Sequence, residues 1–142
     1  MRQRVWLATA IVALGVSGVA CASDEPAAGV SPDAGIATTL SDFAIRPAEV
    51  EAPAGSVTFD LTNEGPSDHS FLVARTDIAE DALPATDHVV DLDALEVVIQ
   101  VDEVPFEAES VISADLEAGD YVLFCALPGH YESDMHTAFT VT

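Results

Sequence analysis

The chain has 142 residues, of which 25 are acidic and four are basic. Every acidic residue lies after Cys21, where two arginines, Arg46 and Arg75, are the only cations, so 25 carboxylates leave a formal charge of −23. A surface this negative repels phosphate, which excludes nucleic acid as a partner and favours a cationic partner or a salty surrounding. The roughly 120 residues after Cys21 are enough for one domain with one core.

Residues 1–20 have the pattern of a secretory signal. Arg2 and Arg4 precede an apolar stretch from Trp6 to Ala20, which is short for a membrane span. The sequence Gly18-Val19-Ala20-Cys21 resembles the lipobox of bacterial lipoproteins, although Gly18 stands where leucine is usual. We expect an exported protein on the cell surface or the periplasmic face of the membrane, anchored by lipid on Cys21. Ordinary cleavage nearby is the alternative.

Residues 21–35 are small, polar and turn-prone, and we interpret them as a flexible tether. The domain is expected over residues 36–142, where apolar residues recur with a period of two and Pro and Gly break the segments. We expect an all-β fold, a Greek-key β-sandwich or barrel of about seven or eight strands. The alternation marks strands around Val57–Leu61, Phe71–Val73, Val97–Val101, Val111, Tyr121–Cys125 and Thr137–Thr142.

One stretch departs from the strand pattern and predicts a short helical insertion. Asp77 is a suitable N-cap and Pro84 a stop for a helix over residues 77–83. Residues 84–96 are predicted to form an acidic loop with a turn of helix near residues 91–95. His88 lies in this loop and is expected to be exposed.

The segment from Cys125 to Met135 carries the chemistry. It places a thiolate, an imidazole and a thioether at Cys125, His130 and Met135, and His69 adds a second imidazole at the start of another predicted strand. Two imidazoles, a thiolate and a weak thioether are the ligand set of a blue copper centre. Because an exported protein has little use for a free thiol, the location of Cys125 supports a metal site.

Each of these residues also has a simpler interpretation. A lone cysteine or methionine is often core filler, and either histidine could be a turn residue. Cys125 and His130 could also form a nucleophile and base, but no third group is evident to orient them. His136 follows Met135 directly, so in a strand its side chain should point away from the metal. We expect a metal site without catalysis, and we leave His136 out of it.

The domain resembles the cupredoxins, the family of small blue copper proteins. The stretch Val57–Asn63 with Gly65 and His69-Ser70-Phe71 resembles the segment that delivers the first histidine ligand, and Gly119–His130 resembles the segment that delivers the next two ligands. The resemblance implies one type 1 copper ion with His69, Cys125 and His130 as equatorial ligands and Met135 as the axial ligand. Relatives commonly have glycine just before this methionine, where the chain has Asp134.

The same resemblance implies a carrier of single electrons rather than an enzyme, working as a monomer outside the cytoplasm. His130 would be the electron port, with an apolar collar from Leu127, Pro128 and Tyr131. The acidic surface would steer a basic redox partner such as a cytochrome or an oxidase. A non-redox copper carrier or store is the alternative function, although a chain with only Met1 and Met135 lacks the extra methionines of a copper relay.

Overall fold

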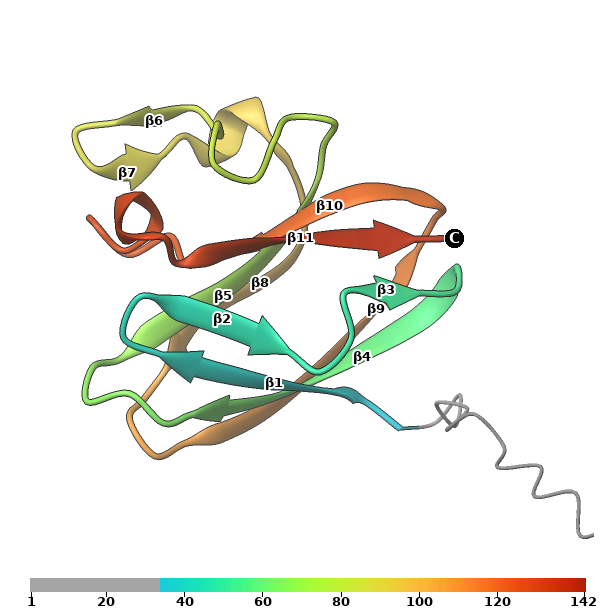
Figure 1. The fold of residues 1–142 in the computed structure, drawn as a ribbon, viewed down its shortest axis with the longest axis horizontal. Helices are drawn as coiled ribbons and strands as arrows, with labels where there is room; N and C mark the ends of the chain where they lie inside the picture. The colour runs from blue at the N-terminus through green and yellow to red at the C-terminus, as the bar shows by residue number, and fades with distance from the viewer. Residues whose placement is uncertain (1–33) are drawn as a thin grey trace, which may run out of the picture. The chain divides into compact units, whose positions relative to one another are not determined.

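The computed structural model describes residues 34–142, and its strands form two main sheets (Figure 1). The four-stranded sheet has the order β2 (Ala44–Pro47), β1 (Ile36–Ser41), β4 (Gly55–Asn63) and β9 (Glu109–Leu116). The five-stranded sheet has the order β3 (Glu51–Ala52), β11 (His136–Val141), β10 (Gly119–Phe124), β5 (His69–Arg75) and β8 (Glu96–Val104). A small hairpin of β6 (Ala85–Thr86) and β7 (Val89–Val90) and the 3₁₀ turns η1 (Leu92–Ala94) and η2 (Tyr131–Ser133) complete the domain.

The core lies between the two sheets. Phe59 of β4 packs with its ring centroid 5.2 Å from that of Phe71 in β5 and 5.4 Å from that of Phe139 in β11. The alternating apolar residues of β4 all point into this layer, as the period of two predicted. Tyr121 and Leu123 of β10 join the same core cluster, and Cys125 follows them with the same parity. The all-β expectation is confirmed, and the two packed sheets form a sandwich.

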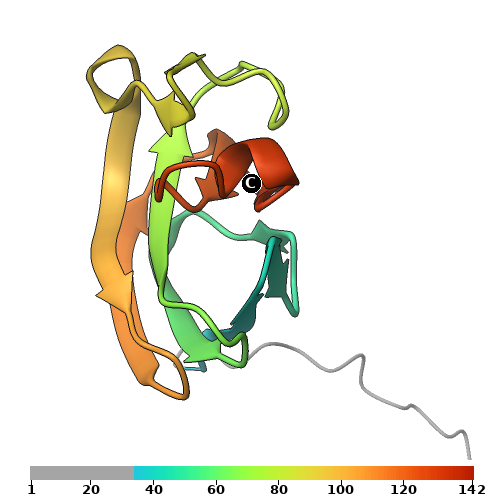
Figure 2. The same ribbon diagram turned by 90° about the vertical axis from the view of Figure 1, so that its left-hand side faces the viewer.

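The five-stranded sheet is also covered on its outer face. Leu72 of β5 and Phe124 of β10 point outward and pack in a second cluster with Leu83, Val90 and Tyr131. Six consecutive residues of β5 and four of β10 are therefore buried, which explains the unbroken apolar runs at residues 71–74 and 121–124. The cover consists of residues 76–95 and η2, and the β6–β7 hairpin lies beside η2 in both Figure 1 and Figure 2.

The helix predicted over residues 77–83 is wrong. This segment contains bends and one turn, in which the amide of Ala82 donates to the carbonyl of Ala79 over 2.9 Å. A helix of seven residues is marginal on its own, and here the burial of Leu83 on the sheet decides the conformation instead. The turn of helix expected near residues 91–95 is present as η1, capped by the carboxylate of Asp91.

The strands outnumber the seven or eight expected, because β3, β6 and β7 have only two residues each and leave no periodic pattern in the sequence. Between Ala34 and Thr142 no helix is long and apolar enough to cross a membrane. The predicted signal, the lipobox cysteine and nearly all of the tether lie outside the described residues.

Candidate metal centre

Three of the four predicted ligands converge at one end of the core. The ligand atoms of His69, Cys125 and His130 all lie within 4.8 Å of one another. Nδ1 of His69 is 3.3 Å from Nδ1 of His130, which in turn is 3.5 Å from Sγ of Cys125. Met135 is fully buried in the same core cluster as Cys125. The structure thus brings together residues that are up to 66 positions apart in the sequence.

His69 is the first residue of β5, and the loop before it is fixed by a buried asparagine. The side-chain amide of Asn63 donates to the carbonyls of Ser67 (2.9 Å) and Val104 (2.8 Å), while its oxygen accepts from the amide of Gly65 (3.0 Å). This loop delivers His69 with no exposed surface. The loop is therefore a rigid support for the imidazole.

The other donors come from the segment between β10 and β11. The amide of Cys125 donates to the carbonyl of Met135 over 3.1 Å, and the amide of Met135 donates to the carbonyl of His130 over 3.2 Å. These bonds close the segment on itself, with Gly129 at a positive φ of 80° allowing the turn. Asp134 caps η2 in the left-handed conformation at φ 68°. That conformation explains why glycine suits this position.

Ser70 lies next to the sulfur of Cys125. Its backbone nitrogen and its hydroxyl oxygen are each 3.4 Å from Sγ, and Ser70 is itself buried. The hydroxyl also accepts a bond of 2.8 Å from the amide of Ala126. The sequence pattern does not single out Ser70 as part of the site, although it directly follows His69. Its two contacts give the buried sulfur polar neighbours on the side of β5.

The second nitrogen of His69 faces a carboxylate. Nε2 lies 3.4 Å from Oδ1 of Asp42, yet it is buried and makes no hydrogen bond of good geometry with the described residues. Burial lowers the pKa of His69, and the nearby His130 lowers it further, while Asp42 opposes both effects. His69 is therefore held as a neutral imidazole, the form that binds a metal.

His130 is half buried and lies beside exposed apolar side chains. The ring of Phe43, which is 49% exposed, meets the ring of His130 edge-on with centroids 5.7 Å apart. Pro128 is exposed and Leu127 half exposed, as expected for an apolar collar. Tyr131 does not belong to this collar, because it is only 6% exposed and its hydroxyl binds Leu83 and Glu80. Phe43 could not be predicted as part of the site, because it lies more than 80 positions before the ligand loop in the sequence, although the fold brings it against His130.

The two remaining histidines lie outside the donor cluster. His88 is exposed, as predicted, and its Nδ1 contacts the carboxylate of Glu132 closely. This contact raises the pKa of His88. The ring of His136 packs against that of Tyr131 with centroids 4.9 Å apart. His136 thus packs on the outer cluster, in agreement with its exclusion from the site.

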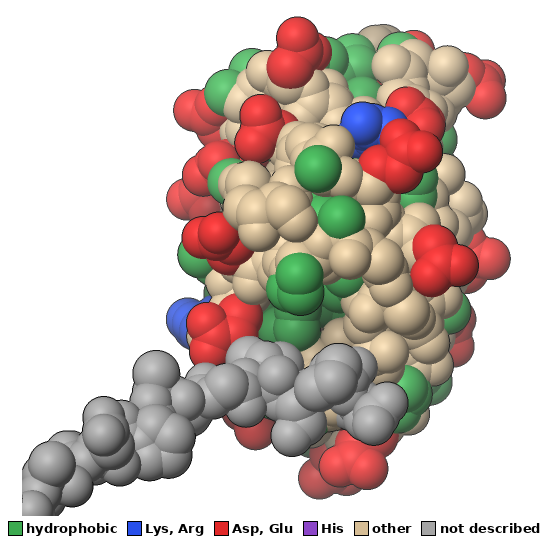
Figure 3. Space-filling model, turned by 90° about the vertical axis from the view of Figure 1, so that its right-hand side faces the viewer, with side chains coloured by type: hydrophobic (Ala, Val, Ile, Leu, Met, Phe, Trp, Pro, Cys, Tyr) green, Lys and Arg blue, Asp and Glu red, His purple; other side chains and the backbone are tan. Residues whose placement is uncertain are grey.

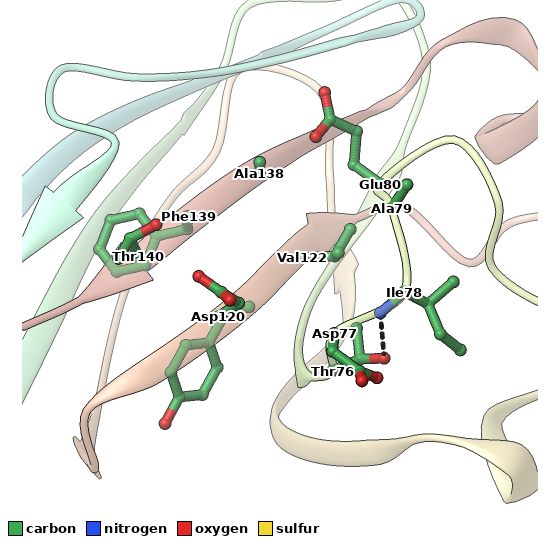
Figure 4. A pocket seen from close by; sticks show the side chains of 11 residues that line it. Thr76, Asp77, Ile78, Ala79, Glu80, Asp120, Val122, Ala138, Phe139 and Thr140 are labelled. Atoms are coloured by element: carbon green, nitrogen blue, oxygen red, sulfur yellow. Dashed lines mark hydrogen bonds between the residues drawn. The ribbon is translucent and has the colours of Figure 1, made fainter.

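A separate hollow of about 190 Å³ lies on the outer face of β10 and β11 (Figure 4). None of the four predicted ligands lines it, and its polar groups are mainly Asp77, Glu80 and Asp120. The side-chain oxygen of Thr76 accepts a bond of 3.1 Å from the amide of Ile78 and so fixes one rim. It is an acidic surface depression that is distinct from the donor cluster.

The donor cluster fits a single copper ion. Donors with metal bonds of about 2.0 Å for nitrogen and 2.3 Å for sulfur lie about 3.3–3.7 Å apart at near-tetrahedral to trigonal angles. The two distances that involve Nδ1 of His130, 3.3 and 3.5 Å, fall in this range. One thiolate with two imidazoles and a thioether suits copper better than a hard cation such as Mg²⁺ or Ca²⁺.

No family model matches the chain, and no curated protein matches it in sequence. Solved structures do match its fold. Reduced auracyanin from the photosynthetic bacterium Roseiflexus castenholzii superposes with a TM-score of 0.58 at 18% identity, over 76% of this chain and 96% of that one. Auracyanin B gives 0.56 at 18% identity, over 80% and 91% of the two chains. Rusticyanin from Thiobacillus ferrooxidans gives 0.54 at 17% identity, over 75% and 76%.

Auracyanin and rusticyanin are cupredoxins, and their likeness to this chain extends over the domain that carries the donor cluster. The identities are low, so the comparison concerns the fold, while the site rests on the side chains themselves. His69, Cys125 and His130 supply the converging donors, and Met135 is buried beside them. The chain has the cupredoxin fold, and its donor set supports a single type 1 copper site.

Proposed function

We propose that the protein is a blue copper protein that carries single electrons between redox partners. The observation that carries this proposal is that one ligand atom from each of His69, Cys125 and His130 lies within 4.8 Å of the others, with His69 and Cys125 buried. We assign His69, Cys125 and His130 as equatorial ligands and Met135 as the axial ligand. When bound, copper supplies a one-electron couple between Cu(II) and Cu(I).

The residues of the chain hold the donors and exclude water. Three of the ligands have no exposed surface, so solvent does not reach their ligand atoms: His69, Cys125 and Met135. Asn63 and Ser70 fix the two segments that carry the ligands. Fixed donors keep the geometry alike in both oxidation states, which favours rapid electron transfer. Cys125 and His130 are proposed to act as metal ligands rather than as a nucleophile and base, so we propose no enzymatic activity.

His130 is the ligand through which we propose that electrons enter and leave, because it is the only half-buried one of the four. Phe43, Leu127 and Pro128 form an apolar margin beside it, suited to a small and short-lived contact with a partner. Acidic side chains are also spread over the side of the domain away from η2, which Figure 3 shows, and basic ones are scarce there. The residues after Cys21 hold 25 carboxylates against two arginines. We therefore propose a basic partner, such as a cytochrome or an oxidase, and a monomeric carrier.

The carrier is proposed to work outside the cytoplasm. This rests on the secretory pattern of residues 1–20 and on Cys21 in a lipobox-like context, which would anchor the domain at the membrane through residues 21–35. Export also accounts for Cys125 as the one free thiol among the described residues, since a thiolate bound to copper is protected from oxidation. Labelling of Cys21 with a radioactive fatty acid, against Cys21→Ala, tests the anchor.

The decisive experiment is a visible absorption spectrum after addition of Cu(II), beside the Cys125→Ser variant. We expect an intense thiolate-to-copper band in the protein and none in the variant, with reversible bleaching by a mild reductant. Met135→Ala serves as a second variant, which should keep the band but shift the reduction potential. A protein that binds copper without this band, and passes it readily to a chelator, would instead be a copper carrier or store.

A further inference from the structure

We propose that Asp42 is a positioning residue of the copper site, whose carboxylate binds and polarises Nε2 of His69. This inference rests on the proposed function, because it concerns the ligand field of the same site. The two nitrogens of His69 have opposite surroundings: Nδ1 faces His130 at 3.3 Å, whereas Nε2 faces Oδ1 of Asp42 at 3.4 Å. Asp42 is the only carboxylate within 4 Å of this imidazole among the described residues.

The tautomer of His69 explains why a carboxylate is needed. A neutral imidazole that binds a metal through Nδ1 carries its proton on Nε2. Nε2 is buried and has no hydrogen-bond partner in the part of the chain that the structure describes. A buried N–H without an acceptor is costly, and a carboxylate is the strongest acceptor a protein offers. Oδ1 of Asp42 already lies 3.4 Å from Nε2, and a small rotation of the Asp42 side chain would shorten and align this contact into a hydrogen bond.

The surrounding backbone leaves room for this contact. A Cβ added to Gly65 would lie 2.8 Å from the amide nitrogen of Asp42 and 3.0 Å from both Oδ1 of Asp42 and Nε2 of His69. Gly65 therefore keeps open the gap in which the two groups meet. The β1–β2 turn is tied to this loop by a bond of 2.8 Å from the amide of Glu64 to the carbonyl of Leu40. This bond holds the β1–β2 turn, and with it Asp42, against the loop that carries His69.

The neighbour of Asp42 supports the same role for this turn. Phe43 has a φ of 61°, which is unusual for an aromatic residue and marks a constrained turn. Its ring lies against His130, so the two residues of the turn contact the two histidine ligands separately. Asp42 has 34% of its side chain exposed, and its charge remains solvated on the outer side. The turn is therefore a second layer behind both imidazoles.

A carboxylate bound to the distal N–H of a ligating imidazole makes that imidazole a stronger donor. A stronger nitrogen donor stabilises Cu(II) more than Cu(I), so Asp42 is expected to lower the reduction potential. Removing its charge in Asp42→Asn keeps the size of the side chain and an oxygen acceptor. We expect this variant to lose about tenfold in the affinity for Cu(II) relative to Cu(I), a rise of about 59 mV in potential.

The matched control is Asp68→Asn. Asp68 directly precedes His69 and carries the same charge, but its Oδ1 accepts from the amide of Phe106 and does not contact the imidazole. Voltammetry of the copper-loaded full chain should show a shift for Asp42→Asn at least twice that for Asp68→Asn. A second measurement is the Nε2–H proton resonance of His69 in the Cu(I) form, which should move upfield in Asp42→Asn and stay in place in Asp68→Asn.

The outcomes separate this inference from the proposed function. If the thiolate-to-copper band forms but both variants match the parent in potential and in the His69 resonance, Asp42 has no positioning role and the carrier function stands. If the parent forms no such band, the proposed function fails and this inference fails with it. Equal shifts in both variants would show a general effect of charge and would also overturn the role of Asp42.

Discussion

The hydroxyl of Ser70 lies 3.4 Å from Sγ of Cys125 while it accepts a bond from the amide of Ala126. Because the hydroxyl oxygen already accepts, its own proton is free to point at the sulfur. The backbone N–H of Ser70 donates to the same atom. Hydrogen bonds to a thiolate withdraw charge from it, which weakens its bond to Cu(II) and favours Cu(I).

We therefore predict that Ser70→Ala lowers the reduction potential. The loss of one hydrogen bond, about 0.5–1.5 kcal/mol, corresponds to roughly 20–60 mV for one electron. Voltammetry of the copper-loaded protein measures it. Ser133→Ala is the matched control, because the hydroxyl of Ser133 binds the carbonyl of Gly129 in the ligand loop without contacting the sulfur. A potential that is unchanged or raised in Ser70→Ala would contradict this prediction.

Asp134 is expected to affect both stability and potential, for separate reasons. Its left-handed backbone favours glycine, so Asp134→Gly should not destabilise the domain and should gain up to about 1 kcal/mol. Its negative charge next to Met135 favours Cu(II), so the potential should rise when the charge is removed. Asp134→Ala separates the effects: it should raise the potential as glycine does but lower the melting temperature. If the reduction potentials of Asp134→Gly and Asp134→Ala were equal to or lower than that of the unsubstituted protein, the charge of Asp134 would not have the predicted effect.

The buried hydroxyl of Tyr131 joins the ligand loop to the segment that covers the sheet. It accepts from the amide of Leu83 over 2.8 Å and donates to the carbonyl of Glu80 over 2.9 Å. Tyr131→Phe leaves the amide of Leu83 and the carbonyl of Glu80 without this partner. The variant should therefore lower the free energy of unfolding by about 1–3 kcal/mol. Denaturant unfolding checks this cost, and faster amide exchange at Leu83 locates it. The reduction potential should stay constant, since the hydroxyl lies in the outer cluster.

The copper-free domain should lose stability at mildly acidic pH because of His69. Burial and His130 lower the pKa of His69 below its ordinary value of 6.5, so the unfolded chain binds the proton first. The stabilisation is complete above pH 6.5 and is lost as the pH falls through the lowered pKa. Urea unfolding between pH 7 and pH 5 measures the trend, and the slope should be smaller in His69→Gln. If the unfolding free energy changed equally with pH in the protein and in His69→Gln, a group other than His69 would determine the pH dependence.

The ligand loop could be predicted from the sequence because Cys125, His130 and Met135 share one short segment with a fixed spacing. His69 was identifiable as well, since it opens a strand with a clear apolar pattern. The resemblance to the cupredoxins added the role of each ligand to this pattern. The loop between β10 and β11 is closed by bonds within its own segment, so its local spacing was informative.

Asp42 and Phe43 could not be found in the same way. The β1–β2 turn reaches the site because β1 pairs in parallel with β4, which places Leu40 opposite Asn63. Such a register depends on the packing of the whole sheet and leaves no mark on the sequence near Asp42. The failed helix at residues 77–83 has a related cause, because its conformation depends on a sheet surface formed by distant strands.

The burial of β5 and β10 on both faces also sets the route by which a bound ion departs. His69 and Cys125 are attached to strands that move only if a sheet covered on both sides opens. His130 belongs to a half-buried loop, whose local opening requires far less free energy than unfolding of the domain. Under the proposed function, we expect the residence time of copper to follow the opening rate of residues 126–134, so that the ion would stay bound through many encounters with redox partners.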